Sequence, residues 1–219
     1  MDREQQKEIV KKFKEIRLNT AFKLPKDTTE RVIVLSKEIG RKTEPVFILD
    51  GIQFHPHITI YSPEYPESNI DKVLKILKEI ADRTTKIQLT FQEIKSHDGY
   101  IGIYFELSPE IKSLHKEIVV ELNPLRHNYL REEHRLRVDY QMDFSPAQLE
   151  NIAKYGYPDA MNLYRPHLTI IRLKNESLAE EIVKNIKWET PRFLIEKLAL
   201  YKMGEHGTCK KLVEEFLFK

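Results

Sequence analysis

The 219-residue sequence is poor in cysteine, in glycine and in long apolar runs, and each shortage excludes a class of protein. A single cysteine, Cys209, excludes an intramolecular disulfide framework and a cysteine-rich zinc site, and it favours a reducing compartment. No run approaches the roughly 18 apolar residues that a membrane span needs. The opening stretch MDREQQKEIVKKFKEI is too polar for a signal peptide. We therefore expect a cytoplasmic protein of one large domain or two small lobes.

Net charge is equally modest, at +2. Bulk electrostatics therefore do not require a nucleic-acid partner. Residues 123–144 form an arginine-rich segment without lysine, and the planar guanidinium suits phosphate better than an ammonium does. The alternative is a solvated helix face on which the arginines pair with neighbouring glutamates, the commoner arrangement of charge runs. The arginines of this segment are Arg126, Arg131, Arg135 and Arg137.

Apolar periodicity and helix-capping residues predict alternating helices and strands, hence an α+β chain. Ser-Pro pairs open two of the helices, and a glycine ends one of them. The predicted helices are residues 3–18, 68–82, a helix opened by Ser108-Pro109, one from Ser145-Pro146 to Gly156, and 176–186. The predicted strands are residues 30–37, 45–50, 54–61, the hairpin of 86–94 with 100–108, and residues 165–173, 192–203 and 210–218.

One short phrase occurs twice. FHPHITIY, at residues 54–61, returns as YRPHLTII, at residues 164–171. Both copies contain Pro-His-aliphatic-Thr-Ile on a predicted strand, and each is followed by a helix and more strands. This order predicts two lobes of similar build.

Alternate side chains of a strand share a face, so His57 and Thr59 are expected on one face of the first copy, and His167 and Thr169 on one face of the second. Two histidines can serve as general base and general acid near neutral pH. Threonine hydroxyls can donate to the non-bridging oxygens of a phosphate. The pattern favours phosphodiester chemistry without metal. The plainer interpretation, two buried strands with satisfied histidines, leaves the matched pair unexplained.

The arrangement resembles the 2H phosphoesterase superfamily, in which His-x-Thr occurs twice, each time on a strand. This superfamily includes 2′-5′ RNA ligase-like proteins and cyclic nucleotide phosphodiesterases. His57, Thr59, His167 and Thr169 fall on its four motif positions, and the resemblance covers roughly residues 28–219.

The resemblance implies a two-lobed, pseudo-symmetric α+β fold, with an antiparallel sheet in each lobe and helices outside. Residues 28–219 would form two intertwined lobes, and residues 1–27 an N-terminal helix and linker that pack on them. The implied activity opens 2′,3′-cyclic phosphates, or makes and breaks 2′-5′ linkages, on RNA ends or small nucleotides. No metal or other cofactor and no membrane partner is expected, and the chain is expected to be monomeric.

Five further residues are candidate substrate contacts. His55 and Arg165 precede the motif histidines by two positions. His55-x-His57 could also be read as a metal pair, but a duplicated metal site would not replace a ligand by arginine. Arg172 matches an arginine often found in the RNA ligase-like branch, although its odd offset from His167 puts it on the opposite face unless the strand bends or ends. Tyr61, expected to continue the face of His57, and Tyr164 could stack on a base or ribose.

Two alternative functions stay open. One is an RNA-phosphate-binding module that has lost turnover, although a binder would not need both proton-transfer groups. The other is a phosphodiesterase for a non-RNA cyclic phosphate or a signalling dinucleotide. The first motif continues SPEY rather than the Phe-Leu-Gly common in the RNA ligase-like branch, which leaves the substrate open.

Overall fold

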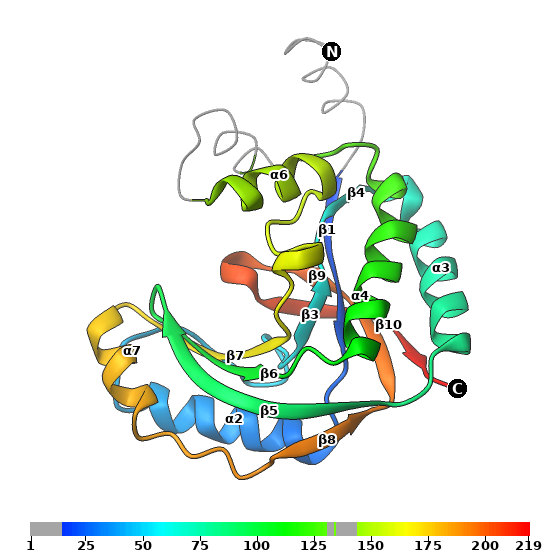
Figure 1. The fold of residues 1–219 in the computed structure, drawn as a ribbon. Helices are drawn as coiled ribbons and strands as arrows, with labels where there is room; N and C mark the ends of the chain where they lie inside the picture. Colours follow the sequence, from blue (N-terminus) through cyan, green and yellow to red (C-terminus); the bar gives the residue numbers. More distant parts are fainter. Residues whose placement is uncertain (1–14, 131–133, 135–143) are drawn as a thin grey trace.

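The computed structural model describes residues 15–130, 134 and 144–219 (Figure 1). Its strands are β1 (Glu15–Phe22), β2 (Pro45–Ile48), β3 (Ile58–Tyr61), β4 (Glu64–Pro66), β5 (Ile87–His97), β6 (Tyr100–Phe105), β7 (His167–Leu173), β8 (Arg192–Ile195), β9 (Lys197–Met203) and β10 (Cys209–Leu217). Its helices are α2 (Lys26–Gly40), α3 (Ile70–Arg83), α4 (Pro109–Leu122), α6 (Pro146–Tyr155) and α7 (Glu176–Val183). Short 3-10 turns are η1 (Glu67–Asn69), η2 (Asn123–Arg126), η3 (Met161–Leu163) and η4 (Glu205–Gly207).

The described strands form one ten-stranded antiparallel sheet, ordered β10-β9-β1-β3-β7-β6-β5-β8, with β2 paired to β7 and β4 to β1. Its two halves meet where β3 pairs with β7. We call β1, β3, β4, β9 and β10 the strands of the first lobe, and β2, β5, β6, β7 and β8 those of the second. The α+β architecture of two related halves agrees with the expected fold.

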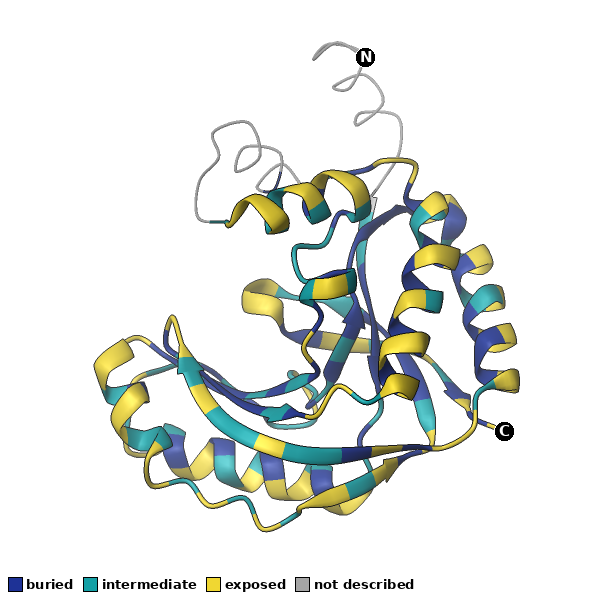
Figure 2. Ribbon diagram, viewed as in Figure 1, coloured by how far each residue is buried: buried dark blue, intermediate teal, exposed yellow. Residues whose placement is uncertain are grey.

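Helices pack across the lobes in a crossed pattern. Helix α2 follows β1 in the chain but packs on β2 and β7 of the second lobe, whereas α4 follows β6 but packs on β3 of the first (Figure 1). Helices α3 and α7 stay with the lobes of the preceding strands, β4 and β7. Their outer faces are exposed and their inner faces buried (Figure 2). None of the helices among the described residues is long and apolar enough to cross a membrane.

Two secondary-structure predictions were wrong near the N-terminus. Residues 30–37, predicted as a strand, belong to helix α2. The buried residues Val32, Ser36 and Ile39 lie on one helix face. Because Ser36 is polar, the apolar residues of this segment do not show the helical period in the sequence. Its hydroxyl accepts a hydrogen bond from the Leu49 backbone N–H at 2.9 Å, which satisfies the group in the core.

Residues 15–18, predicted as the end of a helix, begin strand β1, and residues 3–14 of that prediction lie outside the described residues. Strand β1 lies between β3 and β9, so this part of the 1–27 segment is an interior strand of the sheet rather than a linker. Leu18 and Phe22 bury one face of β1 and Asn19 and Ala21 the other. A strand with two buried faces has no period-2 signal, which explains the error.

The predicted strand 192–203 is two strands. β8 pairs with β5 in the second lobe and β9 pairs with β1 in the first, so the chain crosses between lobes at Glu196. The predictions of the β5–β6 hairpin and of the helix after Ser145 are confirmed. Ser145 and Gln148 form a reciprocal capping box, and Gly156 ends the helix with a left-handed φ of 68°.

Candidate active site

The two His-x-Thr motifs lie side by side on one face of the sheet. Strands β3 and β7 pair at Ile58 and Leu168, both fully buried on the opposite face. Extending this antiparallel register by one residue in each direction puts each motif histidine opposite the threonine of the other motif. We call these four half-buried side chains the His-Thr cluster, and the side of the sheet that carries them the site face. The cluster consists of His57, Thr59, His167 and Thr169.

Both motif strands carry a β-bulge at the same position. In the pairing of β3 with β1, Thr20 and Ala21 face Tyr61 and Thr59, which leaves Ile60 as the extra residue. In the pairing of β7 with β6, the extra residue is Ile170, the equivalent position of the second motif. A bulge reverses the alternation of side chains beyond it. The two motifs therefore share a β-bulge as well as a sequence pattern, and the sequence pattern did not predict this bulge.

The bulge decides the positions of two predicted contacts. Beyond Ile170, Arg172 returns to the site face despite its odd offset from His167. Tyr61 is turned away from that face, so its predicted place beside His57 was wrong. Tyr61 is 0% exposed, and its hydroxyl donates to the backbone carbonyl of Tyr155 at 2.6 Å.

Arg172 lies over the ring of Tyr100, with its guanidinium carbon 4.5 Å from the ring centroid. Its Nε donates to the Asp98 carbonyl at 3.3 Å, and Nη1 lies 3.3 Å from Nδ1 of His206. His206 belongs to η4, between two strands of the first lobe. Arg172 is thus held at the site face by groups from both lobes.

Each motif histidine is fixed by the backbone two residues before it. Nδ1 of His57 lies 2.8 Å from the His55 carbonyl, and Nδ1 of His167 lies 2.9 Å from the Arg165 carbonyl. Because a carbonyl can only accept, Nδ1 carries the hydrogen in both rings. Each Nε2 is then the atom that can take or give a proton. Sequence reasoning assigned His55 and Arg165 as side-chain contacts and missed this backbone role.

The surroundings of the two histidines differ. His57 lies beside Tyr201, with ring centroids 6.4 Å apart. Burial lowers the pKa of His57 to about 4, with smaller contributions in the same direction from the charges of His167 and His55, while the bond to the His55 carbonyl opposes the shift. His167 instead stacks on Tyr104 of β6, at 5.4 Å between centroids and 24° between planes.

Thr59 is held at both its side chain and its backbone. Nδ2 of the fully buried Asn19 donates to Thr59 Oγ1 at 2.8 Å, and the Tyr164 hydroxyl donates to the Thr59 carbonyl at 3.0 Å. Tyr164, predicted to contact substrate, is 3% exposed and stacks on His115 at 3.9 Å between centroids. That prediction was wrong, since the ring lies behind the site. The local sequence pattern did not identify Asn19, which lies directly after a segment predicted as helix.

His55 and Arg165 are placed differently from each other. The His55 backbone N–H donates to the Cys209 carbonyl at 2.9 Å, and its half-buried ring lies 5.6 Å from that of Tyr201. Residues 55 and 209 thereby form an isolated β-bridge that ties the first motif to β10. Arg165 is exposed, on the second-lobe side of the cluster.

The predicted site residues thus fall into two groups. The structure brings the His-Thr cluster together with His55 and Arg172, and it separates Tyr61 and Tyr164 from them. Arg165 contacts the cluster through its backbone carbonyl, and its side chain is exposed. Among the described residues, no three histidine, cysteine, aspartate or glutamate side chains gather as metal ligands. His55 and His57, the possible metal pair of the sequence analysis, are therefore not joined by a third such ligand among the described residues.

Arg126, from the arginine-rich segment 123–144, lies neither at a phosphate site nor on a solvated helix face, the two alternatives that the sequence left open. Arg126 is 0% exposed, and its guanidinium donates to the carbonyls of Ala153 and Lys154 at the end of α6. A cation at a helix C-terminus is favoured by the helix dipole. Arg126 is neither a solvated surface residue nor open to phosphate, whereas Arg131, Arg135 and Arg137 lie outside the described residues.

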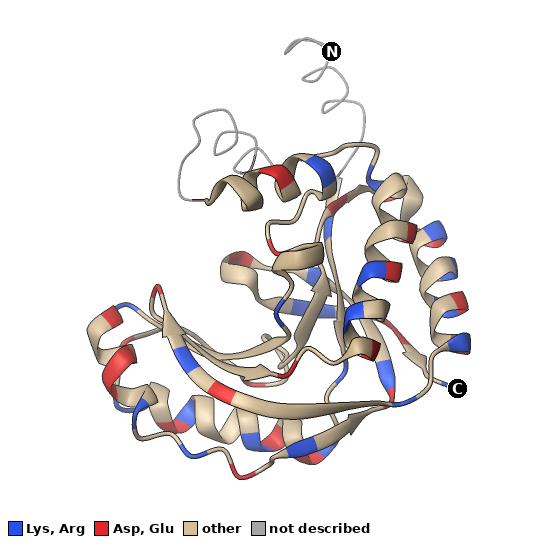
Figure 3. Ribbon diagram, viewed as in Figure 1, with Lys and Arg blue, Asp and Glu red and all other residues tan. Residues whose placement is uncertain are grey.

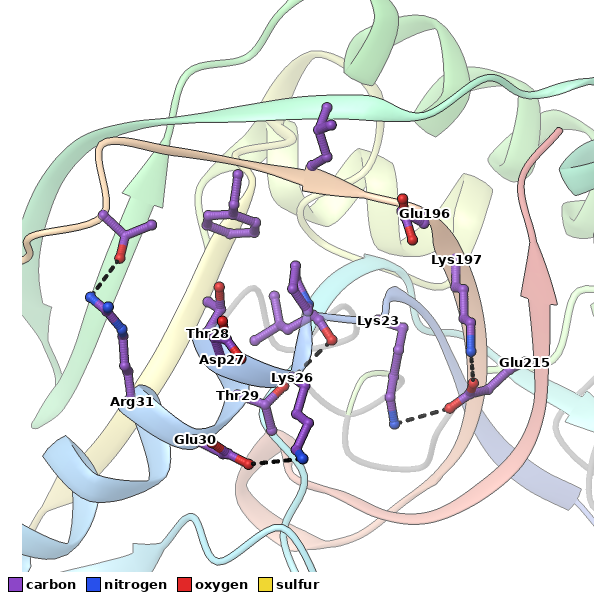
Figure 4. A pocket seen from close by; sticks show the side chains of 15 residues that line it. Lys23, Lys26, Asp27, Thr28, Thr29, Glu30, Arg31, Glu196, Lys197 and Glu215 are labelled. Carbon is purple, nitrogen blue, oxygen red and sulfur yellow. Dashed lines mark hydrogen bonds and ion pairs between the residues drawn. The ribbon is translucent and has the colours of Figure 1, made fainter.

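A cavity of about 870 Å³ lies apart from the cluster, between the first turn of α2 and strands β8 to β10 (Figure 4). Its charges are largely paired. Lys23 and Lys197 share Glu215, at 3.0 and 2.9 Å, and Lys26 lies 3.8 Å from Glu30. Basic and acidic residues are also interspersed along the rest of the described chain (Figure 3). Because its lysines are paired with carboxylates, this cavity is a weak candidate for binding an anion.

Comparison with solved structures finds the same fold. TT0787 of Thermus thermophilus is 14% identical, with 93% of this chain and 98% of that chain covered and a TM-score of 0.57. LigT of E. coli, in its complex with 3′-AMP, is 14% identical, with 94% and 98% covered and a TM-score of 0.56. Its NADP⁺ complex is 11% identical, with 94% and 99% covered and a TM-score of 0.56. No curated protein matches the chain.

A sequence model of the 2′-5′ RNA ligase superfamily matches residues 53–207, more than half of the chain. The match spans both His-x-Thr motifs and the elements that bring them together. The chain therefore belongs to the 2′-5′ RNA ligase superfamily, within the 2H phosphoesterases.

Proposed function

We propose that this protein is a metal-independent phosphoesterase that hydrolyses or forms ribose phosphodiesters. Its substrates would be RNA ends or small nucleotides that carry a 2′,3′-cyclic phosphate or a 2′-5′ linkage. The observation that carries the proposal is the matched pair of histidines, each with Nδ1 bound to a carbonyl and each opposite a threonine of the other motif. LigT, a protein of the same fold, has been solved with 3′-AMP, with ATP and with phosphate.

In hydrolysis of a 2′,3′-cyclic phosphate, a water oxygen attacks the phosphorus while the Nε2 of one histidine accepts its proton. The bond from phosphorus to one ribose oxygen breaks, and the Nε2–H of the other histidine protonates that oxygen. The product is a ribose phosphomonoester. Ligation is the same step with a ribose hydroxyl in place of water as the attacking group, and its product is a phosphodiester linkage. Cleavage of that linkage is the reverse reaction, in which the two histidines exchange roles.

The two threonines would hold the phosphate between the histidines. Thr59 and Thr169 can each donate a hydroxyl proton to a non-bridging oxygen, which stabilises charge in the transition state. Arg172, held at the site face over Tyr100, supplies a cation for a phosphate oxygen or for a neighbouring phosphate.

The decisive experiment is a panel of adenosine 2′,3′-cyclic phosphate, 2′-5′ oligonucleotides and signalling dinucleotides, with the position of the product phosphate determined. The proposal is supported if the wild-type protein turns over a substrate at a rate that chelator does not change, and if both His57→Ala and His167→Ala abolish this turnover. Tight binding without product would instead support an RNA-phosphate-binding module. Turnover confined to a dinucleotide would support a signalling phosphodiesterase, and a rate that is lost on chelation and returns with zinc or manganese would contradict the metal-free mechanism.

A further inference from the structure

Asn19 is a buried amide beside Thr59 of the His-Thr cluster, on the neighbouring strand β1. It is fully buried in β1 and lies cross-strand from Tyr201 of β9. Ala21, two residues further on, pairs with Thr59, so the side chain of Asn19 reaches Thr59 along the strand diagonal on the same face. The distance from Asn19 Nδ2 to Thr59 Oγ1 is 2.8 Å.

This contact fixes the direction of the Thr59 hydroxyl. The amide N–H can only donate, so Oγ1 accepts, and the hydroxyl proton is left for another acceptor. A hydroxyl that accepts a hydrogen bond is polarised and donates more strongly. Since the Tyr164 hydroxyl also binds the Thr59 carbonyl, both ends of this residue are held before a ligand arrives.

The second lobe lacks this arrangement at the matching position. Thr169 pairs with Gly102, and the residue equivalent to Asn19 across the bulge is Tyr100, which lies under Arg172. Among the described residues, no side chain donates to the Thr169 hydroxyl. The two motif threonines therefore differ: Thr59 accepts a hydrogen bond from Asn19, and Thr169 has no equivalent donor among the described residues.

We propose that Asn19 is a positioning residue that holds the Thr59 hydroxyl as a ready donor to a non-bridging phosphate oxygen. The phosphate is then held by a preorganised threonine in the first lobe and, in the second, by a threonine whose hydroxyl has no such donor among the described residues. The inference rests on the proposed function, because it assumes that the His-Thr cluster binds a phosphate.

The test is a double-mutant cycle that combines Asn19→Leu, a change of similar volume without a donor, with Thr59→Val and separately with Thr169→Val. For Asn19→Leu alone, kcat/KM on adenosine 2′,3′-cyclic phosphate should fall roughly tenfold, about the factor that the loss of one hydrogen bond gives. In the Thr59→Val background the same change should have no further effect. In the Thr169→Val background it should again cost the full tenfold.

Two further variants separate positioning from folding. Thr20→Val alters the neighbouring buried residue, whose hydroxyl has no partner among the described residues, and it should leave kcat/KM unchanged. Asn19→Ser keeps a polar group that is too short to reach Thr59, so it should reproduce the loss seen with leucine. Thermal unfolding of each variant verifies that the compared proteins are folded.

Binding of inorganic phosphate gives a readout that does not need turnover. By isothermal titration calorimetry, Asn19→Leu should weaken phosphate binding when Thr59 is present and have no effect when it is valine. Equal losses in both backgrounds, or no loss in either, would overturn the role of Asn19. Coupling in phosphate binding without turnover of any substrate in the panel would uphold Asn19 as a positioning residue and reject the proposed enzyme.

Discussion

The two lobes carry the same motif on the same bulged strand, yet they surround it differently. His57 lies half-buried beside Tyr201, and burial lowers its pKa, whereas His167 stacks on Tyr104 of the neighbouring strand. Thr59 accepts a bond from a buried amide, and Thr169 faces Gly102. The repeated motif thus places the same side chains in both lobes, while the adjacent strands set the environment of each.

The largest expected effect tests whether the histidines have unlike roles. His57→Ala and His167→Ala should each lower kcat/KM on a cyclic phosphate on the order of 10²–10⁴-fold, the range for general acid–base catalysis. A p-nitrophenyl phosphodiester, whose leaving group needs no proton, should restore the rate of one variant much more than the other. The pKa of about 4 keeps His57 neutral at pH 7 in the free protein, which favours the His167 variant as the one restored.

Restoration of the His57 variant would instead mean that a bound phosphate raises the His57 pKa enough for it to act as the acid. Equal restoration of both variants would contradict unlike roles and reduce the site to a phosphate cradle.

The second-largest expected effect concerns the two motif threonines, whose surroundings differ between the lobes. Thr59→Ala should lower kcat by roughly 10²-fold, as the loss of one preorganised donor does, and Thr169→Ala should lower it as well. The Thr59 change should have the larger effect, because that hydroxyl is already directed by Asn19. Steady-state kinetics measures kcat of both variants, and thermal unfolding verifies that they are folded. An unchanged kcat in both variants would show that neither hydroxyl contacts the phosphate.

Protein stability should fall as the medium becomes acid. Burial lowers the pKa of His57 and of His115 to about 4, so between pH 6.5 and 4 the unfolded chain binds more protons than the folded protein. His115 should cost about 2 kcal/mol between pH 7 and pH 5, and the partly exposed His57 less. Urea unfolding at both pH values measures this loss.

His115→Gln supplies the control for this measurement. His115 donates from Nδ1 to the Ile60 carbonyl and accepts from the Met161 N–H, so its replacement should lower stability at both pH values. The pH-dependent part should nevertheless shrink by about 2 kcal/mol, because the titrating group is gone. A pH dependence identical to that of the parent protein would show that His115 titrates normally.

The smallest expected effect concerns the arginine that distinguishes the second lobe. Ser62 occupies the first-motif position that Arg172 occupies in the second. Arg172→Gln should raise KM roughly tenfold with little change in kcat, as expected when a charge-assisted contact to phosphate is lost. Arg192→Gln, an exposed arginine on β8, is the matched control. Equal KM values in the two variants would remove Arg172 from the substrate site.

Much of this site could be read from the sequence because its signals are local. The repeated Pro-His-aliphatic-Thr-Ile phrase identified both strands, and the Ser145 capping box identified a helix. The predictions failed where burial on both faces removed the period, as in β1, or where a buried polar residue interrupted it, as Ser36 does in α2.

The sequence by itself identified the groups that we propose to react: two histidines and two threonines, at matching positions of two strands. Only the tertiary structure decided how they meet, because the register of β3 against β7 and the bulges at Ile60 and Ile170 depend on contacts between residues far apart in the chain. Those contacts turn Tyr61 into the core and Arg172 onto the site face. They also bring Asn19 to Thr59, since β1 and β3 become neighbours only when the sheet forms.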